Sequence, residues 1–348
     1  MRIHLGHHFY GAGNLGDDFM LAGFLAAMKS LAPDATYTCC VPFGLVPLRL
    51  RFPAVQWFPH EDADRARCVA ECDVWLGLGG APFQSALSRW FLDHLVGEMD
   101  LCERERKPMF YLGIGIQTAA DLAEADVRHL VGRAAHIWTR DFGSAEKLRA
   151  LPSRPQIDSA GDLAHIFFCD HNPPPAKPKR LTLVANFDYD AWPGQAECLD
   201  AVKKLPATER VWLAQEGRDL PGAERRLYAT LSAAEKVWWT FASPEQPGAP
   251  LAEVIAGWPS GEWLVTARYH SAVAAAWAGS KIAVISTNEK LRSVAHDLHA
   301  PLLPLRADEG TVFRALSGAQ PAKPPVHLAD RARTACAEFV RSAIAHRR

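Results

Sequence analysis

Short apolar segments alternate with amphipathic stretches along most of the chain. In the first half, apolar runs at 2–9, 74–78, 109–114 and 136–139 are separated by turns and by helical patterns such as 18–31. Short apolar runs bounded by turn residues are typical of buried strands. Their alternation with amphipathic helices predicts a parallel sheet covered by helices.

A proline-rich segment interrupts this alternation near the middle of the chain. His171–Lys179 contains four prolines, and proline neither propagates a helix nor pairs in a central strand. We therefore expect a linker at 171–180 between a first domain at 1–170 and a second domain at 181–320. The second domain is expected to contain strands at 181–185, 210–214, 263–266 and 281–285 and a helix at 222–231.

The final segment, 321–348, predicts an amphipathic terminal helix. Its apolar residues recur at helical spacing from Leu328 to His346, after a proline-rich approach. A chain of 348 residues also suits two domains of similar size. The sequence thus predicts an α/β fold of two Rossmann-like lobes with parallel sheets and a cleft between the lobes.

The composition is that of a soluble globular protein. Hydrophobic residues make up 49%, charged residues 22%, and the formal net charge is -1, so no bulk charge recruits nucleic acid or a lipid surface. The eight cysteines show neither a Cys-x-x-Cys pair nor zinc-site spacing, which favours reduced thiols. No signal peptide and no run of about 18 apolar residues is visible, so we expect no transmembrane segment and a cytoplasmic location.

Histidines cluster on the first expected strand, at His4, His7 and His8. The chain has no His-Glu-x-x-His motif or comparable helical pair. We interpret these histidines as hydrogen-bonded or solvent-facing, and we expect neither a metal nor an organic cofactor.

Three glycine-rich loops follow expected strands, where doubly wound sheets bind their ligands. The first, Gly11–Gly16, fits the pattern Gly-x-Gly-x-x-Gly, whose backbone amides can bind a phosphate at a helix start. Asp34 stands at a spacing suited to a ribose contact, but its Ala-Pro-Asp-Ala context favours an ordinary turn. The other loops are 77–82 and 113–117. Any one of them can serve only as a tight strand exit, whereas three at one rim favour a binding cleft.

Charged residues end another strand of the first half. Arg140 and Asp141 follow the strand at 136–139. Capping of the next helix, or pairing with neighbours, is as good an interpretation of this pair as a role in a site.

An arginine and a histidine mark the most informative turn of the chain. The strand at 263–266 leads through Arg268 and His270 into a small-residue helix at 271–278. In extended geometry residues two apart point to the same side, so these two side chains are expected to project together. They would form an anion clamp beside a proton carrier. The alternative for His270 is a structural hydrogen bond at the start of the helix.

The order and spacing of these motifs resemble those of the polysaccharide pyruvyl transferases. The residues that carry the resemblance are Gly11, Gly13, Asn14, Gly16 and Asp17; Gly79 and Gly80; Gly113, Gly115 and Ile116; Thr139, Arg140, Asp141, Ser144 and Leu148; Asp162, Leu163 and Ala164; and Ala267, Arg268, Tyr269 and His270, followed by Ala278 and Gly279. The chain departs from the family pattern at Ala81, where a third glycine is typical. It departs again at Ile114, Gln117 and Thr118, in a loop that often reads Gly-Gln-Gly-Ile-Gly-Pro.

The resemblance implies two GT-B-like lobes, phosphoenolpyruvate as donor, and a pyruvate ketal on a sugar, lipid-linked sugar or polysaccharide acceptor. Phosphoenolpyruvate carries a carboxylate and a phosphate, which planar guanidinium groups and backbone amides bind well. We expect Arg268 and Arg140 to bind this donor and His270 to act as general acid or base. The further expected substrate-binding residues are Gly13, Asn14, Gly16, Gly79, Gly80, Gly115, Gln117 and Lys290.

An aspartate could complete the expected proton transfer. Asp17 could accept the hydroxyl proton or orient His270, with Asp18 and Asp141 as weaker candidates. Helix capping explains an aspartate at a strand-to-helix turn equally well.

Three other functions fit parts of the pattern. A GT-B-type glycosyltransferase using a nucleotide sugar would share the two-lobed cleft and a basic residue for the diphosphate. A non-catalytic metabolite-binding relative would keep the fold, and the altered loop at 113–118 is compatible with it. A nicotinamide dehydrogenase rests on the first glycine loop alone. Trp192, Trp238 and Trp239 could stack on sugars, although core packing is the more typical role.

Overall fold

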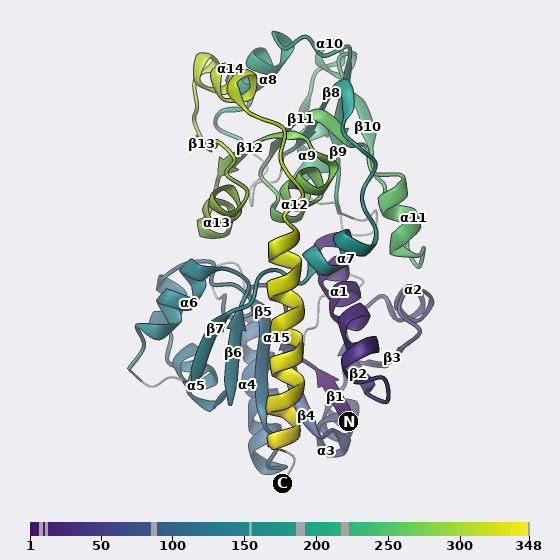
Figure 1. Ribbon diagram of the computed structural model, residues 1–348, viewed down its shortest axis with the longest axis vertical. Helices are drawn as coiled ribbons and strands as arrows, with labels where there is room; N and C mark the ends of the chain where they lie inside the picture. Colours follow the sequence, from purple (N-terminus) through teal and green to yellow (C-terminus); the bar gives the residue numbers. More distant parts are fainter. Residues whose placement is uncertain are drawn as a thin grey trace. The chain divides into compact units, whose positions relative to one another are not determined.

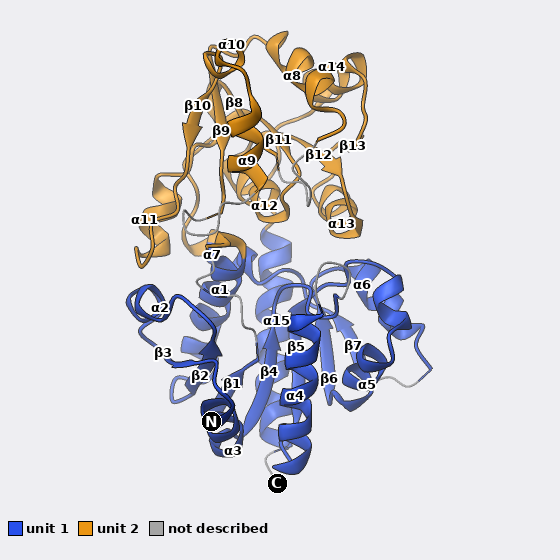
Figure 2. Cartoon of the chain, turned by 180° about the vertical axis from the view of Figure 1, so that it is seen from behind, with its two compact units in different colours: residues 1–12, 17–167, 326–348 blue, residues 13–16, 168–325 orange. Residues whose placement is uncertain are grey.

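Figure 1 shows the computed structural model of the chain, which describes residues 1–6, 10, 13–84, 89–152, 155–185, 192–216 and 223–346. The chain folds into two units, coloured separately in Figure 2. Unit 1 contains residues 1–12, 17–167 and 326–348, and unit 2 contains residues 13–16 and 168–325. Each unit has a parallel sheet of its own, as the alternation of strands and helices predicts.

The sheet of unit 1 has seven strands in the order β3-β2-β1-β4-β5-β6-β7, and all neighbours are parallel. These strands are β1 (Arg2–Leu5), β2 (Thr36–Val41), β3 (Val55–Pro59), β4 (Val74–Leu78), β5 (Met109–Ile114), β6 (His136–Thr139) and β7 (Gln156–Ser159). The order runs outward from β1 and β4 in both directions, which is the doubly wound order of Rossmann-like folds. Every residue of β4 and β5 is buried, as expected for central parallel strands covered on both faces.

Helices connect these strands. They are α1 (Leu15–Leu31), α2 (Leu45–Arg51), α3 (Asp62–Glu71), α4 (Trp90–Arg104), the short 3₁₀ helix η1 (Ala120–Ala123), α5 (Ala125–Arg133) and α6 (Phe142–Arg149), followed by α7 (Ala164–Asp170), which leads into unit 2. The first two residues of α1 belong to unit 2. Asp34 lies in a turn between α1 and β2, where the amide of Ala35 donates to the carbonyl of Ala32, so the turn interpretation is confirmed.

The first strand is shorter than the apolar run at 2–9. β1 ends at Leu5, and residues 7–9 lie outside the described residues. His4 is fully buried, with Nδ1 3.0 Å from Oγ1 of Thr38 and Nε2 3.8 Å from Oε1 of Glu98. This confirms the hydrogen-bonded interpretation for His4, while His7 and His8 fall outside the described residues.

The C-terminal segment forms the expected amphipathic helix, α15 (Val326–Ala345), and it packs on unit 1. Figure 1 shows it lying across the sheet of that unit. Its buried face consists of Leu328, Ala329, Ala332, Ala335, Cys336, Phe339, Val340 and Ala343. Trp138 on β6 donates from Nε1 to Oε2 of Glu338 at 2.9 Å. The last segment therefore completes the unit that the first residues begin.

The sheet of unit 2 has six parallel strands in the order β10-β9-β8-β11-β12-β13. They are β8 (Lys177–Val184), β9 (Glu209–Leu213), β10 (Thr240–Ala242), β11 (Gly261–Thr266), β12 (Lys281–Ser286) and β13 (Leu302–Pro304). The helices are α8 (Gln195–Lys203), α9 (Ala223–Thr230), α10 (Ala233–Lys236), α11 (Leu251–Ala256), α12 (Tyr269–Ala278), α13 (Glu289–Asp297) and α14 (Glu309–Gly318). Here too the order runs outward in both directions, starting from β8 and β11.

The expected linker at 171–180 is too long, because Lys177 to Arg180 already belong to β8. Pro178 is accommodated there by an irregular start of the strand. Lys179 has a positive φ of 57°, and the pairing of β8 with β11 shifts register between Gly261 and Trp263. A bulge of this kind is one of the few places in a sheet where proline fits.

Within the described part of the chain, no helix is both long and apolar enough to cross a membrane. The eight cysteines are all free thiols.

Candidate functional site

The turn from β11 into α12 lies at the carboxyl edge of the unit 2 sheet, where the strand order reverses. Ligands of doubly wound sheets bind just beyond this point. Arg268 is the N-cap residue of α12. The side chain of Thr266 fixes the turn, because its Oγ1 accepts from the amide of Arg268 at 2.9 Å and donates to the carbonyl of Arg268 at 3.2 Å.

The predicted extended geometry from Arg268 to His270 is wrong, because α12 begins at Tyr269. The hydroxyl of Thr266 accepts from the amide of Arg268 and so stabilises a turn directly after β11. The small residues that follow form a helix in which every residue is buried. His270 is therefore a first-turn residue of α12.

The guanidinium group of Arg268 contacts two carboxylates. Its Nε donates to Oε1 of Glu224 at 2.6 Å, and Nη2 donates to Oε2 of the same residue at 3.3 Å. Nη2 also donates to Oε1 of Glu216. Arg268 is thus held by an ion-pair network within unit 2, although the sequence predicts a guanidinium that projects towards a ligand.

Glu224 is the buried member of this network. Its side chain is 0% exposed, compared with 23% for Glu216 and 11% for Arg268. Burial raises the pKa of the Glu224 carboxyl, whereas a guanidinium at hydrogen-bonding distance favours the ionised form. The charges of Arg225 and Arg226, which lower this pKa, and the contact with Arg268 all act against the effect of burial.

His270 lies directly against the start of α1. A Cβ atom built on Gly16 would lie 2.0 Å from Nδ1 of His270 and 2.8 Å from Cε1. Since only glycine leaves this space free, Gly16 permits the close approach of the imidazole. Both residues belong to unit 2, and His270 is 7% exposed.

The segment 13–16 also contacts the other end of the ion-pair network. Asn14 caps α1 by accepting a hydrogen bond from the amide of Gly16 at 3.3 Å, and it forms an antiparallel bridge with Glu216. Gly13 has a positive φ of 88°. The structure thus brings Gly16 against His270 and links Asn14 to Arg268 through Glu216, while Gly11 and Ala12 lie outside the described residues.

Arg140 occupies the corresponding edge of the unit 1 sheet, after β6. It is 4% exposed, and its guanidinium lies against Gly115, on which a Cβ atom would be 2.4 Å from Nε. Asp141 caps α6, since its carboxylate accepts from both the amide and the hydroxyl of Ser144 at 2.8 Å. Ser144 Oγ in turn accepts from the amide of Ile116 at 2.9 Å. This capping role accounts for Asp141.

The glycine loops after β4 and β5 lie side by side. The amide of Gly115 donates to the carbonyl of Gly80 at 2.8 Å, and both Gly79 and Gly80 have positive φ angles, of 70° and 71°. Gln117 is half-buried beside them. Thr118, one of the departures from the family pattern, exchanges hydrogen bonds with Asp121 of η1, so its side chain is engaged at the start of that short helix.

Three other charged candidates lie at helix starts. Asp17 is in the first turn of α1 and 8% exposed. Asp18 forms a buried ion pair with Arg51 at 2.5 Å, which gives it a structural role. Lys290 is half-buried in α13, after β12.

Sequence comparison decides the family. The family model for polysaccharide pyruvyl transferases matches residues 14–287. The chain belongs to the polysaccharide pyruvyl transferase family. The matched range contains the turn at Arg268 and His270, the loop of Arg140 and all the glycine turns from Gly16 onward. No curated protein matches the chain at a significant level of sequence similarity.

Solved structures show the fold of this pyruvyl transferase family member. It is similar to a putative UDP-N-acetylglucosamine 2-epimerase from Listeria monocytogenes, with a TM-score of 0.61, 12% identity, and coverage of 99% of this chain and 95% of that one. The UDP-GlcNAc 2-epimerase from Neisseria meningitidis, bound to UDP-GlcNAc, has a TM-score of 0.62 and 10% identity, and the match covers 98% of this chain and 100% of that one. HepE from Anabaena, in complex with UDP and glucose, has a TM-score of 0.60 and 10% identity, with coverage of 99% of both chains. At these identities the likeness shows a GT-B-like fold of two Rossmann-like domains.

Glu216 and Glu224 are the functional candidates that sequence reasoning missed in this family member. Glu216 follows β9 closely, so the rule that points to strand ends could have found it. Glu224 lies 44 residues before Arg268 in the chain, and no local pattern signals the contact.

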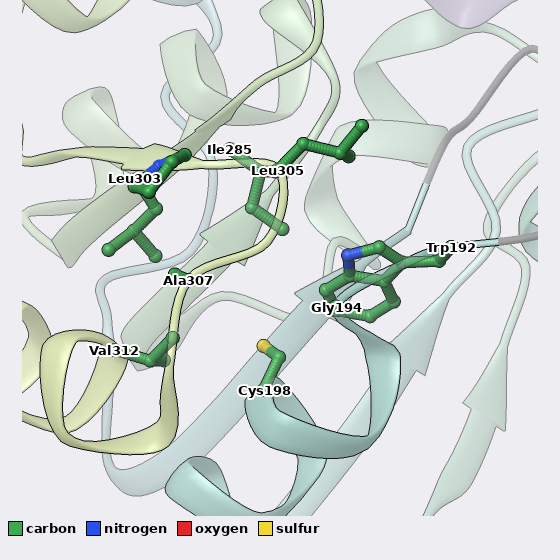
Figure 3. A pocket seen from close by; sticks show the side chains of 9 residues that line it. Trp192, Gly194, Cys198, Ile285, Leu303, Leu305, Ala307 and Val312 are labelled. Carbon is green, nitrogen blue, oxygen red and sulfur yellow. The ribbon is translucent and has the colours of Figure 1, made fainter.

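An apolar pocket of about 190 Å³, including space open to solvent, lies elsewhere in unit 2. Figure 3 shows Trp192, Cys198, Leu303 and Val312 among its walls. No charged residue lines it, so the pocket does not suit a phosphorylated donor. Trp192 is buried in its wall, whereas Trp238 is 50% exposed.

Proposed function

We propose that the protein transfers a pyruvyl group from phosphoenolpyruvate to two hydroxyls of a sugar, lipid-linked sugar or polysaccharide acceptor, forming a ketal. The observation that carries this proposal is the meeting of Arg268 and His270 with the segment 13–16 at the switch point of unit 2. An anion-binding group and a proton carrier at one ligand-binding edge are what this reaction needs. Family membership supports the same reaction.

Donor binding is assigned to arginines and backbone amides. Phosphoenolpyruvate has a carboxylate and a phosphate, and guanidinium groups bind both in a bidentate manner. Within unit 2, Arg268 takes this role with Lys290 as a further cation, and the backbone amides of Gly13, Asn14 and Gly16 add contacts. In unit 1, Arg140, the backbone amides of Gly79, Gly80 and Gly115 and the side chain of Gln117 stay predicted substrate contacts.

The proposed reaction proceeds by addition and elimination at C2 of the donor. His270 supplies a proton to the methylene carbon, which becomes the methyl group, and a sugar hydroxyl attacks the resulting electron-poor C2. The C2–O bond to phosphate then breaks, and a second hydroxyl takes its place. The two hydroxyl protons balance the proton gained by the methyl carbon and the proton taken up by the departing phosphate.

Proton handling is assigned to His270, with Asp17 in support. The imidazole is buried and lies against Gly16, which gives it a defined position from which to donate and later accept a proton. Asp17 follows Gly16 in the first turn of α1 and is assigned to accept a hydroxyl proton. The scheme requires no metal or organic cofactor, and free thiols throughout the chain fit the reducing cytoplasm as its location.

Calorimetric titration with phosphoenolpyruvate tests the donor. We expect saturable binding to the wild type and a loss of about tenfold or more in affinity for Arg268→Lys, which keeps the charge but loses the planar fork. Arg292→Ala is the matched control, since Arg292 is exposed and pairs with Glu289 on α13. Because two similar structures contain UDP or UDP-GlcNAc, the same titration is run with UDP-sugars. Binding of UDP-sugars without binding of phosphoenolpyruvate would overturn the proposal in favour of glycosyl transfer.

A further inference from the structure

The two carboxylates on Arg268 differ in burial and in contact geometry. We propose that Glu224 is a positioning residue that holds Arg268 for anion binding, and that Glu216 occupies the place of the anion until the anion binds. The inference rests on the proposed function in one respect, which is that the anion is a phosphate or carboxylate of the donor.

Glu224 has the properties of a permanent partner. Both of its carboxylate oxygens lie on one edge of the guanidinium, at 2.6 Å from Nε and 3.3 Å from Nη2. Its main-chain carbonyl accepts from Nε1 of Trp212 at 2.9 Å, which ties the start of α9 to β9. A fully buried carboxylate that lost its guanidinium would be left uncompensated in the interior. Glu224 and Arg268 therefore stay together.

Glu216 has the properties of a partner that can exchange. Its Oε1 accepts a hydrogen bond from Nη2 of Arg268, and its side chain is 23% exposed. A carboxylate at the surface returns to water at small cost, because its solvation is only partly removed. A bidentate phosphate or carboxylate makes a stronger contact with the same guanidinium.

An anion that binds Nη2 of Arg268 has to displace Glu216. The carboxylate of Glu216 accepts a hydrogen bond from this group, so it would lie against an anion bound at the same place. A further anion would meet this like charge at close range, which disfavours its binding. Arg225, a nearby cation on α9, is engaged elsewhere, since it donates to Oγ of Ser243 at 2.6 Å and lies over the ring of Phe241. Departure of Glu216 removes a negative charge from this place and frees Nη2 of Arg268 for the anion.

Two neutral, nearly isosteric variants test the proposal with opposite signs. Glu216→Gln removes the competing charge and should tighten binding of phosphoenolpyruvate by about fivefold or more. Glu224→Gln loosens the hold on Arg268 and should weaken binding by about tenfold. Calorimetric titrations use phosphoenolpyruvate and, separately, inorganic phosphate. Glu309→Gln, an exposed change on α14, should leave both affinities unchanged.

A double variant distinguishes the orientation of Arg268 by Glu224 from a general effect of Glu224 on the stability of the fold. In the Arg268→Lys background the planar fork that Glu224 orients is absent. Glu224→Gln should then cause no further loss of phosphate affinity, whereas a purely structural effect of Glu224 would add to that of Arg268→Lys.

The outcomes distinguish this inference from the proposed function. If the wild type binds phosphoenolpyruvate but both glutamine variants shift its affinity in the same direction or not at all, the inference is wrong and the function stands. If the wild type binds inorganic phosphate but not phosphoenolpyruvate, the proposed donor is wrong, and opposite shifts in phosphate affinity still support the inference. If the wild type binds neither, both are overturned.

Discussion

Replacing Gly16 with alanine should move the imidazole of His270 while leaving the fold intact. The new Cβ would lie 2.0 Å from Nδ1 of His270, whereas two nonbonded heavy atoms prefer about 3.5 Å. The ring must therefore shift by about 1.5 Å, since the backbone of α1 is fixed by its capping at Asn14.

Two effects on stability oppose each other in Gly16→Ala. Alanine in a helix is favoured over glycine by about 0.5 to 1 kcal/mol, and inserting a methyl group into a packed site costs about 1 to 3 kcal/mol. The net change in the free energy of unfolding should stay within about 2 kcal/mol. Turnover should fall by about 10²-fold, because a misplacement of about 1 Å at the reacting groups has effects of that size.

The assay pairs thermal unfolding with release of phosphate from phosphoenolpyruvate in the presence of acceptor. Gly97→Ala on α4 is the matched control, since its Cβ would meet a nearest atom at 3.8 Å, on the flexible side chain of Arg65. That variant should keep full turnover and gain slightly in stability. A folded Gly16→Ala protein with the turnover of the wild type would refute the role given to His270 at this position.

Three further predictions follow from the same contacts. His270→Ala should keep its affinity for phosphoenolpyruvate in calorimetry and lose about 10² to 10⁴ in turnover; unchanged turnover would remove it from the reaction. Asp141→Ala removes the cap of α6 and should lower the free energy of unfolding by about 1 to 2 kcal/mol in denaturant titration; an unchanged midpoint would contradict the capping role. Burial raises the pKa of Glu224 to about 8 with Arg268 in place, and Arg268→Ala removes a cation at hydrogen-bonding distance, so it should raise this pKa further. The folded variant then holds a proton that the unfolded chain releases above 4.5, so its stability is full below that pH. Its free energy of unfolding then falls by about 1.4 kcal/mol per pH unit as the pH rises towards 8. Adding Glu224→Gln should abolish this dependence on pH, and a dependence that persists would show that Glu224 is not its source.

Local patterns predicted most of the fold. Each expected strand was predicted from a short apolar run, and such a run is buried because its own side chains are apolar. The strands β4, β5, β11 and β12 therefore begin and end within two residues of their predicted bounds. The amphipathic spacing of the last segment likewise predicted α15. The end of the linker was placed too late, because the bulge that admits Pro178 depends on pairing with β11, far along the chain.

Only the site residues that directly follow a strand could be predicted from the sequence. The rule that points to strand ends located Arg140, Arg268 and His270, and the close approach of His270 to Gly16 gives the first glycine loop a physical reason. The partners of Arg268 were not predictable, because the contact between Arg268 and Glu224 spans 44 residues and depends on the packing of α9 against β9. Which backbone amides and side chains contact the donor stays a prediction.

Transfer of a pyruvyl group can be followed from isotopically labelled phosphoenolpyruvate into an acceptor. Phosphoenolpyruvate labelled in its pyruvyl carbons is incubated with the protein and a panel of glycan acceptors, and products are analysed by mass spectrometry beside a phosphate assay. We expect label in an acceptor as a ketal, with one phosphate released per ketal formed and no product from His270→Ala. Binding of the donor with release of free pyruvate and no labelled acceptor across the panel, or transfer of sugar from a nucleotide sugar instead, would contradict the account.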